Sequence, residues 1–228
     1  MSTAAPLVVR APSAMATARL LVVLDADSTL IQNEVIELLA EHAGSLHAVA
    51  AVTERAMRGE LDFAESLRAR VATLAGLPRT VFDAVAERIR VTDGVPALIA
   101  AVHSAGGAVG VVSGGFHELL DPLGERLGLD FWQANRLELV DGVLTGRVTG
   151  AIVDAAAKAN ALRTWAQQLG IPAGRCIAVG DGANDLQMMA AAALSVAFNA
   201  KPVVRRAADV VIDTQDLSQL LPLLGLRG

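Results

Sequence analysis

The pattern of hydrophobic and polar positions divides the chain into a first strand, a long helical stretch, and a region where strands and helices alternate. Residues 20–24 are consecutive aliphatic side chains, which is typical of a strand covered on both faces. From Glu34 to about Pro96 the hydrophobic positions have helical spacing, and no strand-like run interrupts them. The sequence therefore predicts a helical segment inserted after the first strand.

The second half of the chain predicts the rest of one sheet. Expected strands are 108–112, 176–179, 194–198 and 210–212, with helices over about 116–127 and from about 184 and 216. Such alternation is typical of a parallel sheet with right-handed crossovers. Residues 137–148 alternate with a period of two around an Asp-Gly pair, which predicts a β-hairpin. The fold class is thus α/β with a mostly parallel sheet.

We divide the chain into three parts on these patterns. Residues 1–17 are rich in Ala, Ser and Pro and lack the arrangement of a signal peptide, so we expect a disordered leader, with an organellar transit peptide as the alternative. The core is expected from 18–33 and 97–228. Residues 34–96 are expected to form a helical cap, because an insertion at this point lies naturally over the crevice of the sheet.

Composition narrows the classes of partner. The 228 residues carry a net charge of −5, with 3% aromatic residues and no Tyr, which argues against nucleic acid as a partner. No stretch has the unbroken apolar length of a membrane span. The single cysteine, Cys176, excludes an internal disulfide and suits a reducing compartment. We expect a soluble cytoplasmic protein with a small-molecule partner, and a homodimer stays open.

Four acidic residues follow two of the predicted strands. Asp25 and Asp27 come after the first strand, and Asp181 and Asp185 come after residues 176–179. Ligands of open α/β sheets bind beyond the carboxyl ends of the strands, where these residues would meet. Two carboxylates about 4 Å apart repel by roughly 4 kcal/mol at an effective dielectric constant near 20. A cation with oxygen ligands removes this repulsion, and without a Cys/His cluster we expect Mg²⁺ instead of Zn²⁺.

Other polar residues at the same edge suit a phosphate. Ser113 offers a hydroxyl, the glycines after it let backbone N–H groups approach closely, and Lys158 adds a positive charge. With the phosphoryl charge neutralised, Asp25 can attack phosphorus and form an aspartyl-phosphate. Asp27 is then placed to protonate the leaving alkoxide and later to deprotonate water. The residues predict phosphoryl-transfer chemistry with two catalytic carboxylates.

The order Asp-x-Asp-Ser-Thr, Ser-Gly-Gly, Lys and Gly-Asp-Gly-x-Asn-Asp resembles the haloacid dehalogenase-like phosphatases, over residues 20 to 213. Residues 25–34, 113–116 and 57–70 resemble the phosphoserine phosphatase branch of that superfamily. The resemblance implies a Rossmann-like three-layer core with a small helical cap. It also implies Mg²⁺ held by Asp25, the backbone carbonyl of Asp27 and Asp181, with Asp185 holding a metal-bound water.

The same resemblance implies how phosphate and substrate bind. Ser113, Gly114, Lys158 and Asn184 would bind or support the phosphate. For the substrate it implies four residues, namely Glu34 at the ammonium group, Arg70 at the carboxylate, and Met57 and Phe63 closing the pocket. This is chemically sensible, since Arg binds a carboxylate in bidentate fashion. The expected activity is hydrolysis of O-phospho-L-serine to L-serine and phosphate, as in serine biosynthesis.

Several alternatives stay open. The same site could pass the phosphoryl group to an alcohol such as homoserine, or hydrolyse a broader set of small phosphomonoesters. A signalling receiver domain also surrounds a phosphorylated Asp with acids, Mg²⁺, a hydroxyl and a Lys, but the Asp-x-Asp spacing favours turnover. Glu34 and Arg70 could form an ordinary surface pair, and Met57 and Phe63 could be core residues of the cap. Ala26 and residues 193–195 depart from the family's pattern without touching the proposed chemistry.

Overall fold

The computed structural model describes residues 19–227, and the predicted leader 1–17 lies outside the described residues. One seven-stranded sheet has the order β4-β3-β2-β1-β5-β6-β7. All neighbouring strands are parallel except the β3–β4 pair, so the predicted mostly parallel sheet is confirmed. The strands are β1 (Leu21–Leu24), β2 (Ala108–Phe116), β3 (Phe131–Val140), β4 (Val143–Thr149), β5 (Cys176–Gly180), β6 (Leu194–Phe198) and β7 (Val210–Ile212).

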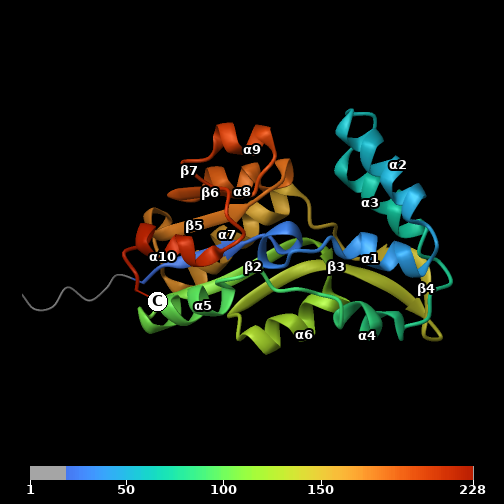
Figure 1. Ribbon diagram of the computed structural model, residues 1–228, viewed down its shortest axis with the longest axis horizontal. Coiled ribbons are helices and arrows are strands. Elements are labelled where there is room, and N and C mark those ends of the chain that lie inside the picture. The colour runs from blue at the N-terminus through green and yellow to red at the C-terminus, as the bar shows by residue number, and fades with distance from the viewer. Residues whose placement is uncertain (1–18, 228) are drawn as a thin grey trace, which may run out of the picture.

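Helices cover both faces of the sheet and give the core three layers (Figure 1). Alternate residues of β1 face opposite layers: Leu21 and Val23 pack with α7 and α8, whereas Val22 and Leu24 pack with α5 and α6. This arrangement confirms the predicted α/β core. The helices are α1 (Val35–His42), α2 (Leu46–Met57), α3 (Phe63–Ala72), α4 (Val81–Ala86), α5 (Val95–Ser104), α6 (His117–Leu127), α7 (Ala155–Leu169), α8 (Leu186–Ala191), α9 (Pro202–Ala207) and α10 (Leu220–Leu223).

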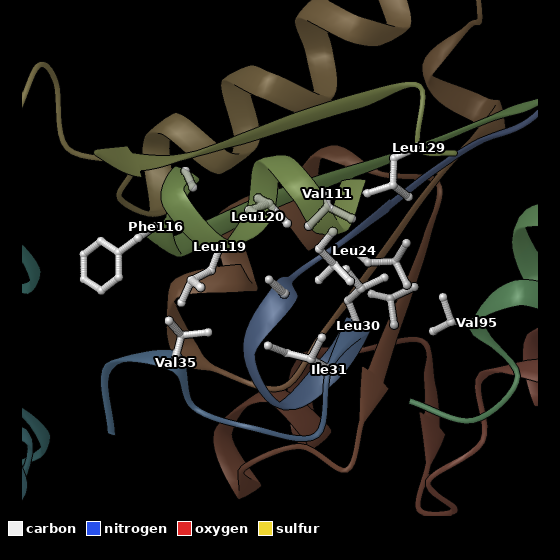
Figure 2. Close-up of a cluster of buried hydrophobic side chains, with 14 of the residues drawn as sticks. Leu24, Leu30, Ile31, Val35, Val95, Val111, Phe116, Leu119, Leu120 and Leu129 are labelled. Atoms are coloured by element: carbon white, nitrogen blue, oxygen red, sulfur yellow. The ribbon is translucent and has the colours of Figure 1, made fainter. Parts of the chain in front are cut away.

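A hydrophobic cluster fixes the chain as it leaves β1. Figure 2 shows Leu24 of β1 and Val111 of β2 together with Leu30 and Ile31, which follow β1, and with Leu120 of α6. Each of these side chains is at most 4% exposed. Burying such a side chain contributes about 1.5–3 kcal/mol, so the segment between Leu24 and Leu30 is held at both ends. Asp25 and Asp27 lie in this segment.

Helices α1 to α4 lie between β1 and β2 in the chain, and α2 and α3 stand side by side, with α3 against the edge strand β4 (Figure 1, cyan). The two segments that link these helices to the core pair with each other, since Gln32 N–H donates to the carbonyl of Arg90 at 2.8 Å. The hairpin gives a second attachment, because Leu144 N–H donates to the carbonyl of Leu77 at 2.9 Å. We propose that this block is the predicted cap.

The β3–β4 hairpin forms where the sequence predicts it. Asp141 and Gly142 have φ angles of 51° and 77°, as a two-residue turn with positive φ at both positions requires. The strand β3 begins earlier than expected, at Phe131, and its first half pairs in parallel with β2. Among the described helices, none is both long enough and apolar enough to cross a membrane.

Candidate active site

Asp25 begins the site at the carboxyl end of β1. Its backbone N–H donates to the carbonyl of Val179 in β5 at 2.9 Å, and its side chain is buried. The chain then makes an irregular turn over Ala26–Leu30, in which Ser28 has a left-handed φ of 56°. Asp25 and Asp27 interact across this turn, since the charge of Asp25 contributes to the raised pKa of Asp27.

The loops after β1 and β5 bring three carboxylates together. Carboxylate oxygens of Asp25, Asp181 and Asp185 all lie within 4.8 Å of one another. The two loops meet because β1 and β5 are neighbours in the sheet. A short 3₁₀ turn over Ala183–Asp185 directs Asp185 back into the site, where its Oδ2 accepts the N–H of Gly182 at 3.0 Å. The grouping that the sequence predicts is thus present in the described chain.

Lys158 is fully buried against two of these carboxylates. Its Nζ lies 2.7 Å from Asp25 Oδ1 and 2.8 Å from Asp185 Oδ1. Helix α7 places it there, with Asp154 capping the helix by accepting the N–H of Ala157. Burial by itself lowers the pKa of Lys158, but attraction to Asp185 and Asp25 outweighs burial and raises this pKa. Lys158 therefore stays protonated beside Asp25.

One lysine does not neutralise the acidic cluster. Burial, followed by repulsion from Asp185, raises the pKa of Asp25 from 3.8 to about 8. The same causes raise the pKa of Asp181 from 3.8 to about 6. Both carboxylates would be stabilised by a further positive charge, and their oxygen atoms suit a hard divalent cation such as Mg²⁺. The described residues around the cluster therefore fit this ion.

The hydrogen bonds distinguish the roles of the carboxylate oxygens. Asp25 Oδ1 already accepts the N–H of Ala26 at 2.7 Å as well as Lys158, which leaves Oδ2 for a metal ion or a substrate. Both oxygens of Asp185 are engaged, by Lys158 and by Gly182 N–H. Asp185 therefore fits the expected place behind a metal-bound water better than direct coordination.

The segment Ser113–Gly115 lies beside Asp27. Ser113 Oγ accepts the N–H of Gly115 at 2.8 Å, so its own hydroxyl hydrogen can be donated to a ligand. A Cβ atom placed on Gly115 would lie 3.0 Å from Ser113 Oγ and 3.2 Å from Asp27 Oδ2. Glycine at 115 thus lets the serine and the second aspartate approach each other. The three groups form one wall of the site.

Glu34, the residue just before α1, and Arg70 of α3 approach the site. Burial lowers the pKa of Arg70, and Glu34 and Asp27 are the first of the charges that oppose this shift. The guanidinium group therefore interacts electrostatically with both acids. Glu34 Oε1 accepts the hydroxyl of Ser28 at 2.7 Å, which ties this carboxylate to the turn after β1. The structure thus brings this pair of opposite charges to Asp27.

The remaining predicted residues, Phe63, Met57 and Asn184, differ in packing and in exposure. Phe63 opens α3 and packs on the Ser113–Gly115 segment, since a Cβ on Gly114 would lie 3.0 Å from Phe63 Cζ. Met57 ends α2 with 75% of its surface exposed. Asn184 is half-buried in the 3₁₀ turn beside Asp185. Phe63 thus closes on the site, and the role of Met57 stays a prediction.

Comparison with known proteins decides the family. The sequence pattern of haloacid dehalogenase-like hydrolases matches residues 22–190. The chain belongs to this family. Among relatives of this hydrolase, a phosphoserine phosphatase of Streptomyces coelicolor is 58% identical over 92% of the chain and 51% of that protein's length. One of Streptococcus thermophilus is 49% identical over 91% of the chain and 97% of that protein. The chain thus spans about half the length of the first relative.

Solved structures agree with the assignment of this chain to the family. A structure described as a phospho-aspartyl intermediate analogue of phosphoserine phosphatase has a TM-score of 0.85 at 41% identity. It covers 90% of this chain and 99% of that chain. A substrate-bound phosphoserine phosphatase complex also has a TM-score of 0.85, at 40% identity, and covers 90% of this chain and 98% of that one. The family resemblance and the fold predicted from the sequence are confirmed.

Three residues at the site of this hydrolase were not predicted from the sequence. Ser28 holds Glu34, Asn135 contacts the backbone of Gly114, and Lys201 lies 4.0 Å from Asp181. Ser28 belongs to the first motif, so only its hydrogen bond was missed. Asn135 and Lys201 carry no motif signal, because their positions depend on strand pairing and on the packing of α9.

The raised pKa values predict how stability of the metal-free hydrolase depends on pH. Because Asp25 and Asp181 hold protons to higher pH in the folded protein than in the unfolded chain, the free energy of unfolding should fall between about pH 4 and pH 8. Saturating Mg²⁺ should oppose this fall, since it binds the ionised folded site. Urea unfolding at several pH values, with EDTA or with Mg²⁺, measures both effects. A metal-free protein that becomes more stable over this range would contradict the electrostatic account.

Proposed function

We propose that this hydrolase cleaves O-phospho-L-serine into L-serine and phosphate through an aspartyl-phosphate on Asp25. The observation that carries the proposal is a buried carboxylate, Asp25, held by Lys158 and followed two residues later by a second acid beside Ser113. Relatives named phosphoserine phosphatase that align over nine-tenths of this chain support it. Serine biosynthesis in the cytoplasm is the proposed setting.

The metal ion of the proposed reaction is Mg²⁺. Asp25, the backbone carbonyl of Asp27 and Asp181 would hold it, with Asp185 behind a metal-bound water. When bound, the ion would supply positive charge that neutralises phosphoryl oxygens. The acidic cluster supports this set, because its carboxylates lie within 4.8 Å of one another and are only partly compensated by Lys158.

The chain's own residues account for the first half of the reaction. The Ser113 hydroxyl, the Gly114 N–H and Lys158 would bind the phosphoryl oxygens and orient phosphorus toward Asp25 Oδ2. The carboxylate then forms a bond to phosphorus as the bond to the serine oxygen breaks. Burial, followed by repulsion from Glu34 and Asp25, raises the pKa of Asp27 well above its usual value. This shift favours the protonated form of Asp27, which can donate its proton to the leaving serine oxygen.

The second half of the reaction uses the same groups. Having lost its proton, Asp27 is a carboxylate and can accept a proton from the attacking water. The water oxygen bonds to phosphorus, the acyl-phosphate bond breaks, and Asp25 is released as a carboxylate. Phosphate leaves and Asp27 is again protonated for the next substrate. Two aspartates two residues apart thus divide nucleophilic attack and proton transfer between them.

Specificity for the amino acid would come from Glu34 and Arg70. Replacing Arg70 by Ala should raise the KM for phosphoserine by about 10- to 100-fold, since a charged hydrogen bond contributes about 1.5–3 kcal/mol. The KM for p-nitrophenyl phosphate, which has no carboxylate, should change by less than about threefold. Arg68→Ala, an exposed site on the same helix, is the matched control. Equal losses on both substrates would mean that Arg70 is structural.

A phosphate-release assay tests the activity itself. Purified protein with Mg²⁺ and phosphoserine should release inorganic phosphate, and homoserine added as acceptor should remain unphosphorylated. Phosphohomoserine formed in place of free phosphate would support transfer instead of hydrolysis. Faster hydrolysis of other phosphorylated metabolites would make the enzyme a broader phosphatase. Absence of phosphate release from every phosphomonoester would refute the proposed function.

A further inference from the structure

Asn135 is a buried polar residue on the strand beside the phosphate-binding segment. It lies in β3 opposite Phe116 of β2, and regular pairing of these strands is interrupted between Val112 and Phe116. The residues that leave the ladder are Ser113–Gly115, so their backbone groups need other partners. Asn135 is only 2% exposed and cannot contact a substrate directly. Its side chain faces the backbone of the site.

The amide nitrogen of Asn135 fixes one peptide unit of this segment. Nδ2 donates to the carbonyl of Gly114 at 2.8 Å. In a trans peptide the N–H of the next residue points the opposite way, and the N–H of Gly115 donates to Ser113 Oγ at 2.8 Å. Asn135 and Ser113 therefore hold the two sides of the same peptide plane. Rotation of this plane would move the Ser113 hydroxyl away from its ligand.

The amide oxygen of Asn135 fixes a second segment. Oδ1 accepts the N–H of Val153 at 2.9 Å. The next residue is Asp154, the N-cap of α7, whose carbonyl accepts the N–H of Lys158 at 2.9 Å. The bond to Asn135 therefore fixes where the helix that carries Lys158 begins. One side chain thus connects the two segments that hold Ser113 and Lys158.

We propose that Asn135 is a positioning residue that sets the distance between the Ser113 segment and Lys158, and so controls affinity for the phosphoryl group. The inference rests on the proposed function only in that both segments bind phosphate. It does not involve the Glu34 and Arg70 side of the site, which comes from the residue just before α1 and from α3. Changes at Asn135 should therefore separate binding of phosphate from binding of serine.

Asn135→Asp tests this with Mg²⁺-loaded protein. The variant keeps the acceptor for Val153 but turns a carboxylate toward the Gly114 carbonyl, so the peptide plane loses its donor. The inhibition constant of inorganic phosphate should rise at least about tenfold, and kcat/KM on p-nitrophenyl phosphate should fall about 100-fold, as misplacement of about 1 Å can cause. The inhibition constant of L-serine should not change. Asn160→Asp, the same replacement at an exposed position of α7, should leave all three values unchanged.

The outcomes separate this inference from the proposed function. Phosphoserine hydrolysis by the wild type tests the proposed function, whereas p-nitrophenyl phosphate and inorganic phosphate test Asn135 whatever the natural substrate is. Unchanged phosphate inhibition in Asn135→Asp, or equal weakening of phosphate and L-serine, would overturn the inference. If this variant does not fold, Asn135→Ser is measured instead. If neither folds, phosphate added to the wild type should slow hydrogen exchange of the Gly115 and Val153 amides together, and slowing of only one or neither would overturn it.

Discussion

Replacing Asp25 by asparagine is expected to reduce turnover of phosphoserine by at least ~10³-fold without loss of the fold. The amide keeps an oxygen that can accept the N–H of Ala26 and contact Lys158, as Asp25 Oδ1 does. It lacks the negative charge that attacks phosphorus. Since the pKa of Asp25 is about 8 without metal, an uncharged group at this position is already well tolerated.

Stability measurements separate loss of chemistry from loss of structure in this variant. The melting temperature of metal-free Asp25→Asn protein should equal or exceed that of the wild type, because repulsion from Asp185 is removed. Stabilisation by Mg²⁺ should be weaker, since one proposed ligand is gone. Asp83→Asn, the same replacement at an exposed position of α4, should leave turnover and stability unchanged. Turnover above about a tenth of the wild-type value would exclude Asp25 as the nucleophile.

Replacing Lys158 by methionine should lower the free energy of unfolding by about 3–5 kcal/mol and also abolish most activity. Lys158 is fully buried between Asp25 and Asp185, and its removal leaves these two buried acidic groups without their shared cation. Methionine fills a similar volume, so the loss would come mainly from charge and not from a cavity. Urea unfolding of metal-free protein near neutral pH measures it.

The chain's other lysine is a matched control for this experiment. Lys201 lies 4.0 Å from Asp181 and is 60% exposed. An exposed ion pair contributes about 0–1 kcal/mol, so Lys201→Met should change the free energy of unfolding by less than about 1 kcal/mol. If both variants lose a similar free energy of unfolding, burial of Lys158 does not explain its contribution to stability.

The sequence predicted those features of the fold that depend on local pattern. Consecutive aliphatic residues identified β1, and the Asp-Gly pair identified the hairpin turn with its two positive φ angles. The early start of β3 was not predicted. Residues 131–136 read as Phe-Trp-Gln-Ala-Asn-Arg and have no alternation, and parallel pairing with β2 organises them as a strand. Asn135 could not be recognised for the same reason, because its role depends on the partner strand.

The site was predictable where chain order implied neighbours in space. Asp25 and Asp181 follow strands that pair in the sheet, so their meeting follows from topology. Complete burial of Lys158 was not predictable, since lysine is almost never fully buried and nothing in its surrounding Ala-rich sequence indicates two acidic partners. The left-handed Ser28 was also not predicted, because backbone strain of this kind is set by packing on both sides of the turn.

Trapping the phosphorylated enzyme tests the central claim most directly. Protein mixed with Mg²⁺ and phosphoserine is quenched in acid within one turnover, digested, and analysed by mass spectrometry. We predict that one phosphoryl group is found on the peptide that contains Asp25, that it is released by hydroxylamine as an acyl-phosphate is, and that Asp25→Asn protein carries none. A fully active wild-type enzyme without this adduct, or with phosphate on another residue, would contradict the account.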